Sequence, residues 1–168
     1  LEVNEMSNWK EFIVNADNDC FELGLIWSKD DSLRQIAVEI AKLIENEDYD
    51  YLACIEAKGI IYASAVSAVC GKELRIFRKL NKISYTDQKY VKTFLNWKKV
   101  KDGIEIEKEQ IKNNDRIIII DDIVDTGITL KSVSSIINEA GGKIVKYICI
   151  KNVSSLHELS GVSIVSLL

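Results

Sequence analysis

The chain of 168 residues carries 22 lysine and arginine residues against 26 acidic residues, which gives a formal net charge of −4. Its 47% hydrophobic and 29% charged residues are typical of a folded globular domain and exclude a disordered or fibrous chain. The acidic balance argues against a surface dedicated to nucleic-acid phosphates, and no apolar run approaches the roughly 18 residues of a membrane span.

The cysteines and the N-terminus indicate a reducing compartment. Cys20, Cys54, Cys70 and Cys149 are far apart, form no CxxC pair, and three of them sit inside apolar runs. We therefore expect buried, reduced thiols instead of disulfides or metal ligands. Because the N-terminus lacks the apolar core of a signal peptide, we expect a soluble, cytoplasmic protein with no membrane or nucleic-acid partner.

The first long element predicted is an amphipathic helix over residues 31–47. Apolar side chains recur there at helical spacing, at Leu33, Ile36, Ala37, Ile40, Leu43 and Ile44. Ser32 and Gln35 have the spacing of a capping box, in which each side chain bonds the backbone amide of the other residue. The spacing predicts that Ser32 caps this helix.

The next segments alternate between strand and helix. Residues 49–56 read as a short buried strand, residues 59–71 as a helix rich in small residues that ends at a glycine, and residues 73–77 as another strand. Such alternation is typical of right-handed βαβ crossovers. It predicts a parallel sheet covered on both faces.

From residue 78 to residue 110 the pattern becomes polar, aromatic and alternating, with no helical period. We interpret this stretch as an antiparallel hairpin or flap. After a turn at residues 112–115, the unbroken "RIIII" of residues 116–120 predicts a fully buried central strand.

The last third of the chain predicts one more helix and two more strands. One face of the helix is formed by Leu130, Val133, Ile136, Ile137 and Ala140, before a pair of glycines stops it. Residues 143–150 and 161–168 read as further strands. The simplest fold is one doubly wound α/β domain with a parallel sheet.

Polar residues gather where the strand over 116–120 ends. Asp121 and Asp122 follow it directly, and residues 125–129 then lead into the next helix. In an open parallel sheet, ligands bind beyond the carboxyl ends of the strands. The unpaired amides of a first helical turn carry partial positive charge, Gly127 allows close backbone approach, and the threonine hydroxyls add donors. This loop suits a phosphate monoester.

The two adjacent acids require a different partner, because carboxylates repel phosphate. A ribose offers two adjacent hydroxyl donors next to a phosphate, and Mg²⁺ could join it. A turn followed by a simple helix cap remains an alternative. A nucleotide-binding P-loop is excluded because "GITLKS" lacks the second glycine. A phosphoacceptor receiver domain is excluded because too few residues follow Asp122 to hold most of its fold.

The stretch "IIIIDDIVDTGIT" resembles the phosphoribosyl pyrophosphate signature of type I phosphoribosyltransferases. Residues 54–66 are similar to the pyrophosphate loop of that family, and "RKLNKIS" over residues 78–84 resembles a basic segment of its adenine enzymes. Residues 102–122 resemble their passage from the flap to the signature strand. The resemblance implies the type I fold as a single domain over 1–168, with residues 1–30 contributing a hood and residues 80–110 a flap.

The resemblance also implies roles for individual residues. Asp121 and Asp122 would hold the ribose hydroxyls and, indirectly, Mg²⁺, and together with Asp125 they would be the catalytic residues. The 5-phosphate would be wrapped by Asp125, Thr126, Gly127, Ile128 and Thr129. The pyrophosphate would meet a loop of Glu56, Ala57, Lys58 and Gly59, with Arg78, Lys79 and Lys82 as cationic partners.

The implied reaction is displacement of pyrophosphate from the anomeric carbon by a nitrogen of a purine base, with Mg²⁺ as cofactor and a homodimer as the expected assembly. Asp125 points toward a 6-oxopurine, because adenine enzymes usually have alanine there. Asn96 stands where their flap has a glutamate. The base stays open among adenine, hypoxanthine, guanine and xanthine. A non-catalytic regulatory protein that binds the sugar phosphate, and an orotate enzyme, are the alternatives.

Three further residues have less specific interpretations. Trp27, in the hood region, suits a core aromatic as well as a base-stacking one. Trp97 could be a lid aromatic or an exposed residue. His157 lies far from the motifs in sequence, so we expect a structural or surface role.

Overall fold

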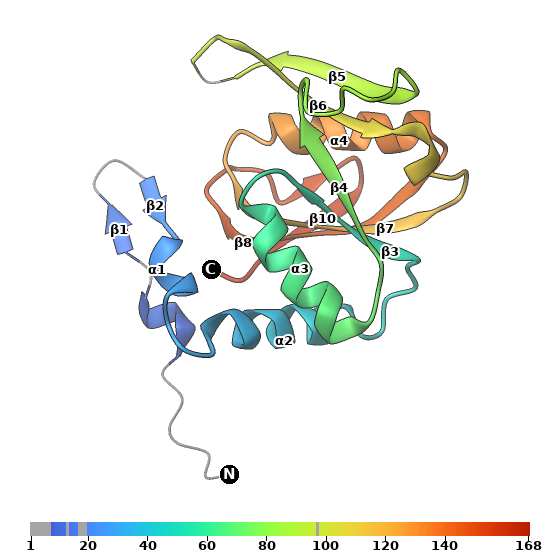
Figure 1. Cartoon of the computed structure of the whole chain (residues 1–168). Helices are drawn as coiled ribbons and strands as arrows, with labels where there is room; N and C mark the ends of the chain where they lie inside the picture. Colours follow the sequence, from blue (N-terminus) through green and yellow to red (C-terminus); the bar gives the residue numbers. More distant parts are fainter. Residues whose placement is uncertain (1–7, 13, 17–19, 97) are drawn as a thin grey trace.

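An eight-stranded sheet forms the centre of the molecule. The computed structural model describes residues 8–12, 14–16, 20–96 and 98–168. The strand order is β5-β6-β4-β3-β7-β8-β10-β9 (Figure 1). The strands are β3 (Tyr51–Ile55), β4 (Leu74–Lys79), β5 (Lys89–Leu95), β6 (Lys101–Glu107), β7 (Arg116–Val124), β8 (Lys143–Asn152), β9 (Glu158–Leu159) and β10 (Val162–Ser166). Strands β4, β3, β7, β8 and β10 run parallel, and the outer strands are antiparallel.

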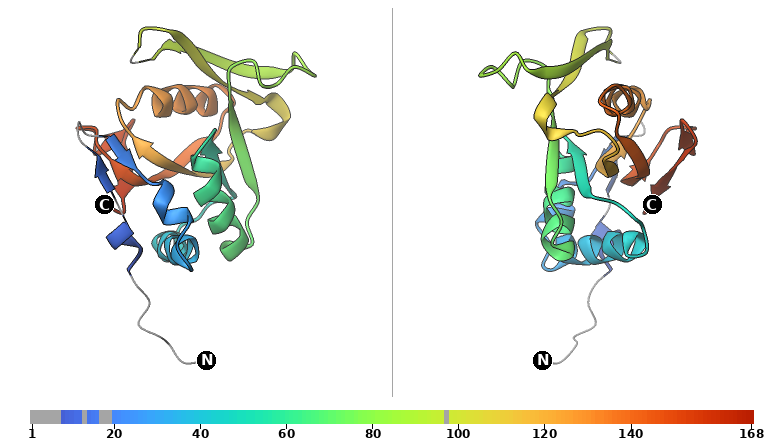
Figure 2. Two further views of the ribbon diagram at one scale, coloured as in Figure 1. Left: turned by 60° about the vertical axis from the view of Figure 1, so that its left-hand side comes forward. Right: turned by 90° about the vertical axis from the view of Figure 1, so that its right-hand side faces the viewer.

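Helices cover both faces of the sheet, which confirms the doubly wound α/β prediction. Helices α2 (Ser32–Ile44) and α3 (Gly59–Cys70) lie on one face, and α4 (Ile128–Glu139) lies on the other (Figures 1 and 2). Within β3, Leu52 and Cys54 join the core under α2 and α3, whereas Ala53 and Ile55 join the core under α4. This period of two explains why the central strands are apolar on every residue.

The N-terminal part forms a small separate layer. It consists of η1 (Trp9–Phe12), a two-stranded antiparallel sheet of β1 (Val14–Ala16) and β2 (Cys20–Glu22), and α1 (Gly24–Trp27). In Figure 1 it lies on the same side of the molecule as the loop between β7 and α4. None of the described helices is long and apolar enough to cross a bilayer.

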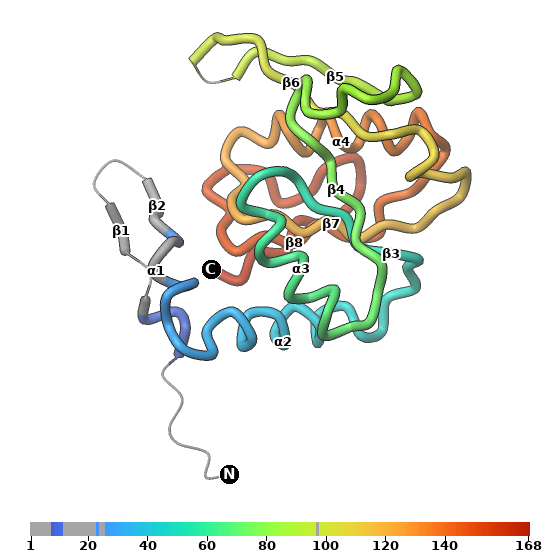
Figure 3. The backbone as a smooth tube through the Cα atoms, viewed as in Figure 1, coloured from blue at the N-terminus to red at the C-terminus, as the bar shows by residue number. Residues whose placement is uncertain are grey.

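The predicted hairpin is confirmed, with β5 and β6 as its strands. Figure 3 follows the backbone from β4 out through this hairpin and back to β7. The hairpin lies over α4, and an ion pair of 2.8 Å joins Lys92 Nζ of β5 to Glu139 Oε2 of α4. We refer to β5 and β6 with the turn between them as the flap hairpin.

Two local predictions are corrected by the structure. The capping box is wrong: the helix cap is Asp31, in a left-handed conformation with φ of 64°, and it makes no side-chain cap bond. Ser32 is already the first helical residue, and its buried hydroxyl has no hydrogen-bond partner. Strand β7 extends to Val124, beyond the predicted end at residue 120, because its pairing with β8 continues as far as Asn152.

The thiols whose side chains are described agree with the expectation of reduced cysteines. Cys54, Cys70 and Cys149 are free, and Cys54 and Cys149 are buried. Burial raises the pKa of each of these two thiols to about 12, so they stay protonated and unreactive. The side chain of Cys20 lies outside the described residues.

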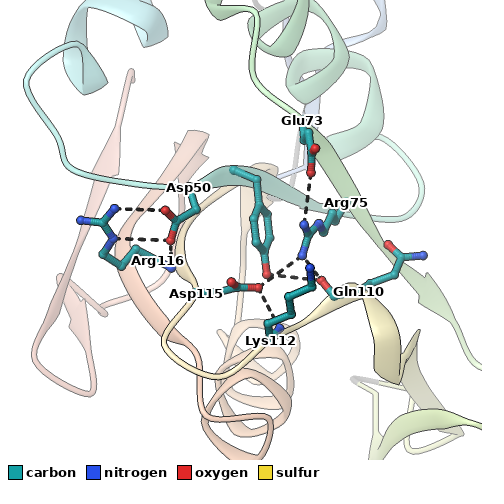
Figure 4. A network of polar contacts seen from close by, with 8 residues as sticks. Asp50, Glu73, Arg75, Gln110, Lys112, Asp115 and Arg116 are labelled. Atoms are coloured by element: carbon teal, nitrogen blue, oxygen red, sulfur yellow. Dashed lines mark hydrogen bonds and ion pairs between the residues drawn. The ribbon is translucent and has the colours of Figure 1, made fainter.

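A polar network joins the amino ends of β4, β3 and β7, at the sheet edge opposite the carboxyl ends (Figure 4). Arg75 lies over the Tyr51 ring, 3.6 Å from its centroid, and pairs with Asp115 at 3.3 Å and Glu73 at 3.1 Å. It also donates to the carbonyl of Gln110. This guanidinium therefore ties three segments that are distant in sequence.

We predict that Arg75→Met lowers the free energy of unfolding by about 2–3 kcal/mol, because the half-buried Asp115 carboxylate and the Gln110 carbonyl each lose a charged donor. Each group keeps one uncharged donor, the Lys112 N–H and the Tyr51 hydroxyl respectively. Urea denaturation measures this loss. Arg34→Met is the control: its exposed pair with Asp31 should contribute almost nothing. Equal effects of the two substitutions would contradict the structural role of the network.

Candidate functional site

The acid pair lies at the carboxyl end of β7, inside the strand. Asp121 is 9% exposed, and its Oδ1 accepts the backbone N–H of Asp122 at 2.9 Å. Burial first, and then the negative charge of Asp122, raise the pKa of Asp121 well above its ordinary value, while Lys79 partly opposes the rise. Asp122 is half-buried. Such a pair favours partners that supply hydroxyl donors or positive charge.

Gly59 brings the loop after β3 against this acid pair. A Cβ at this position would lie 2.7 Å from Asp121 Oδ1 and 3.4 Å from the carbonyl oxygen of Ile120. Only glycine permits this close approach without displacement of the acid. The loop formed by residues 56–59 and the signature strand are therefore adjacent.

The loop from Asp125 to Thr129 begins α4. Gly127 caps the helix with φ of 71°, and a Cβ there would also clash with Leu156 Cδ1. The hydroxyl of Thr126 accepts the N–H of Ile128 at 3.4 Å. Asp125 and Thr126 are exposed, so the loop and the amides of the first helical turn present an anion-binding surface.

These two features share one cavity of about 220 Å³. Its lining comes from β4, the flap hairpin, β7 and the start of α4: Lys79, Phe94, Asn96, Asp102, Asp121, Ile123, Val124, Asp125, Thr126, Gly127, Ile128, Thr129 and Leu130. The structure thus brings together Lys79, Asp121 and the whole predicted phosphate loop. Asp122, the loop formed by residues 56–59, Arg78 and Lys82 lie outside its lining.

Lys79 supplies positive charge between two carboxylates in this cavity. Its Nζ lies 3.5 Å from Asp102 Oδ2, and its charge also acts on Asp121. Sequence reasoning missed Asp102 and Phe94, which the flap hairpin contributes. The sequence shows that polar and apolar residues alternate along both strands of the hairpin. Which face of the hairpin meets the cavity depends on how its strands pair, and the sequence does not show this.

Glu56 ties the predicted pyrophosphate loop to the end of β4. Glu56 Oε2 accepts Nε of Arg78 at 3.0 Å and the backbone N–H of Lys79 at 2.9 Å. Partial burial alone would raise the pKa of Glu56, but these two bonds and the charge of Lys82 outweigh it and lower the pKa. Arg78 and Lys82 are therefore gathered around Glu56, beside the cavity.

The rest of that loop faces the N-terminal layer. The peptide bond between Glu56 and Ala57 is cis, and Ala57 is exposed. Lys58 Nζ lies 5.9 Å from the centroid of the Trp27 ring. Trp27 is half-buried against the core, and its indole N–H donates to the Tyr62 hydroxyl at 2.9 Å. These contacts support the core role for Trp27.

The remaining candidate residues are Asn96, which lines the cavity and also shapes the flap turn, His157 and Trp97. Asn96 Oδ1 accepts the N–H groups of Lys98 and Val100, so this side chain closes the flap turn. His157 is exposed, as expected. Trp97 lies outside the described residues. Among the side chains that the structure describes, no three histidine, cysteine or acidic groups gather to hold a metal ion.

A family model agrees with this geometry. The model for the phosphoribosyl transferase domain matches residues 29–160. The adenine phosphoribosyltransferase of Nitrosopumilus maritimus is 33% identical over 132 residues, which cover 79% of this chain and 76% of that protein. The adenine phosphoribosyltransferase of Petrotoga mobilis is 29% identical over 94% of this chain and 91% of its own length.

Solved structures show the same fold. The adenine phosphoribosyltransferase of Thermoanaerobacter pseudethanolicus superposes with a TM-score of 0.82 at 20% identity, over 94% of this chain and 95% of that one. The Saccharomyces cerevisiae adenine enzyme, complexed with an imino-altritol bisphosphate and adenine, gives 0.82 at 17% identity, over 95% and 96%. Together with the matched family model, the central sheet and the loop at the end of β7 place this chain in the phosphoribosyl transferase domain family, as a phosphoribosyltransferase of the type I fold.

Proposed function

We propose that the protein transfers the phosphoribosyl group of phosphoribosyl pyrophosphate to a purine base, with adenine as the first candidate. The products are a purine nucleoside monophosphate and pyrophosphate. The observation that carries the proposal is the cavity in which the buried acid of β7 meets the anion-binding loop of α4. A ribose 5-phosphate has the matching pair of groups, two vicinal hydroxyls and a phosphate.

The acid pair and the loop at the start of α4 would bind different parts of the sugar phosphate. The amides and hydroxyls of residues 126–129 would hold the phosphate, since they are donors at the positive end of a helix. Asp121 and Asp122 would accept hydrogen bonds from the ribose hydroxyls and fix the sugar's orientation. They also place negative charge near the ring carbon that becomes electron-poor as the leaving group departs.

The chemical step breaks the bond between the anomeric carbon and a pyrophosphate oxygen and forms a bond to a base nitrogen. The electron pair of the broken bond leaves with pyrophosphate, and the proton on the base nitrogen passes to a carboxylate or to solvent. Asp125 is exposed at the cavity lining, where it could take that proton. Lys79, Arg78 and Lys82 would stabilise the departing anion.

Mg²⁺ fits this site as a proposed cofactor that shares the substrate's oxygens. The paired carboxylates of Asp121 and Asp122 are the donors present, and the described residues offer no third acid beside them. Mg²⁺ prefers such an arrangement of one or two carboxylates with substrate phosphates. When bound, it would neutralise charge on the leaving pyrophosphate.

Adenine replaces the 6-oxopurine that Asp125 suggested. The relatives and structures named above are all adenine phosphoribosyltransferases, and they give no support to an oxopurine or to orotate. They also favour an enzyme over a non-catalytic regulatory protein.

We further propose a homodimer that forms through α3. This helix is apolar on nearly all sides, and residues on its outer side, including Ala68 and Val69, are exposed. A helix that is apolar all round is normally buried, so a second copy of the chain is the occupant we propose for its outer face.

The test of function is pyrophosphate release from phosphoribosyl pyrophosphate with Mg²⁺ and each of adenine, hypoxanthine, guanine and xanthine. We expect adenine to give the highest kcat/KM. Asp122→Asn should lower kcat/KM by about 100-fold with an unchanged melting temperature, because it removes an oriented charge from the sugar site. No release with any base would refute the proposal, and an unfolded variant would indicate a structural pair.

For the assembly, light scattering should give twice the 19.0 kDa chain mass. Ala68→Glu should shift this toward one chain, because two facing carboxylates in an apolar interface are costly. Asn138→Glu on α4 is the matched surface control and should remain dimeric. A wild-type mass of one chain would contradict the proposed dimer.

A further inference from the structure

Glu105 of β6 is a carboxylate with no solvent exposure, and the proposed chemistry makes no use of it. Its Oε1 accepts the backbone N–H of Ile83 at 2.6 Å, and its Oε2 lies 3.0 Å from Lys89 Nζ. Burial alone would raise the pKa of Glu105, but these contacts outweigh it and lower the pKa. Oε1 therefore makes a hydrogen bond, whereas Oε2 makes an ion pair with Lys89 but no hydrogen bond.

The ion pair of Glu105 and Lys89 binds the backbone of Ile83. Lys89 Nζ also donates to the carbonyl of Ile83 at 2.5 Å, so both backbone groups of Ile83 are bound by this pair. The Ile83 side chain is itself 1% exposed. We call Glu105, Lys89 and Ile83 the Ile83 clamp.

The clamp closes a short turn that starts at the end of β4. Lys79 pairs with Ile104 in β6, and the N–H of Leu80 donates to the Gly103 carbonyl at 2.9 Å. The N–H of Lys82 then donates to the Lys79 carbonyl at 3.2 Å. The segment from residue 79 to residue 83 is thus fixed at both ends against β6.

This turn carries two cations, of which Lys79 lies in the cavity and Lys82 lies outside its lining. Lys79 lines the cavity, and the charge of Lys82 acts on Glu56 of the loop after β3. Lysine side chains are flexible, so the position of their charge depends on how firmly their backbone is held. A shift of the turn would move both charges together.

We propose that Glu105 is a positioning residue, which acts through the Ile83 clamp to hold Lys79 and Lys82 where the pyrophosphate of the substrate binds. This role rests on the proposed function. Glu105 does not touch the substrate. A buried ion pair stabilises a fold only weakly compared with apolar side chains of the same size, so its use here is better explained by the precision it gives the turn.

The experiment compares two ligands, each of which would occupy a different part of the proposed site. Calorimetry measures the affinity for pyrophosphate with Mg²⁺ and, separately, for ribose 5-phosphate. In Glu105→Ala, the turn is no longer held and Lys79 and Lys82 lose charge-assisted contacts with pyrophosphate. The Kd for pyrophosphate should therefore rise at least about tenfold. The Kd for ribose 5-phosphate should rise clearly less than the Kd for pyrophosphate, because only Lys79 of the two lysines lines the cavity of the phosphate loop.

Two more variants keep the test decisive if Glu105→Ala fails to fold. Glu105→Gln keeps an acceptor for the Ile83 amide and should weaken pyrophosphate binding less than Lys89→Met, which removes the contact to the carbonyl. Glu107→Gln is the matched control: Glu107 lies two residues along the same strand and accepts from Tyr85 and Gln110, not from the turn. Glu107→Gln should change the Kd for pyrophosphate less than Glu105→Ala does, because the charge of Glu107 acts on Arg78 but its carboxylate bonds Tyr85 and Gln110 instead of the turn.

The outcomes separate this role from the proposed function. Folded clamp variants with wild-type affinity for pyrophosphate would overturn the role of Glu105, and so would an equal loss of both affinities. Failure of the wild-type chain to bind either ligand would instead refute the proposed function, and the positioning role with it.

Discussion

The parallel pairing of β7 with β3 on one side and β8 on the other is the constraint on which the site depends. It fixes the carboxyl ends of these strands at one edge, so the loop after β3 and the acid pair of β7 must meet. The close approach of Gly59 to Asp121 follows from this pairing: a Cβ on Gly59 would lie 2.7 Å from Asp121 Oδ1. Neither loop could be moved along its strand without changing which side chains face the cavity.

Negative and positive side chains lie next to one another at this edge of the sheet. Burial of Asp121 raises its pKa, and the backbone N–H of Asp122 and the charge of Lys79 partly oppose that rise. The basic turn after β4 is in turn held by Glu56 and by the clamp on Ile83. The site is therefore built from carboxylates that bind the protein's own cations as well as from those proposed to bind substrate.

Sequence periodicity predicted the elements whose burial is set locally. Helices α2 and α4 follow from apolar spacing, β3 and α3 from their apolar and small-residue runs, and the flap hairpin from alternation. The phosphate loop follows from residue chemistry at a strand end. The capping box failed because Asp31 occupies the cap, so that Ser32 falls inside the helix. Phe94, Asp102 and Glu105 were missed because their roles depend on strand register between distant segments, which local patterns do not contain.

The division between phosphate loop and ribose acids can be tested without turnover, by amide chemical shifts in NMR. Inorganic phosphate should perturb the amides of residues 126–129 only, since it carries no ribose. Ribose 5-phosphate should perturb the same amides and also those of Asp121 and Asp122. Shifts confined to other elements, or identical patterns for the two ligands, would contradict the proposed arrangement.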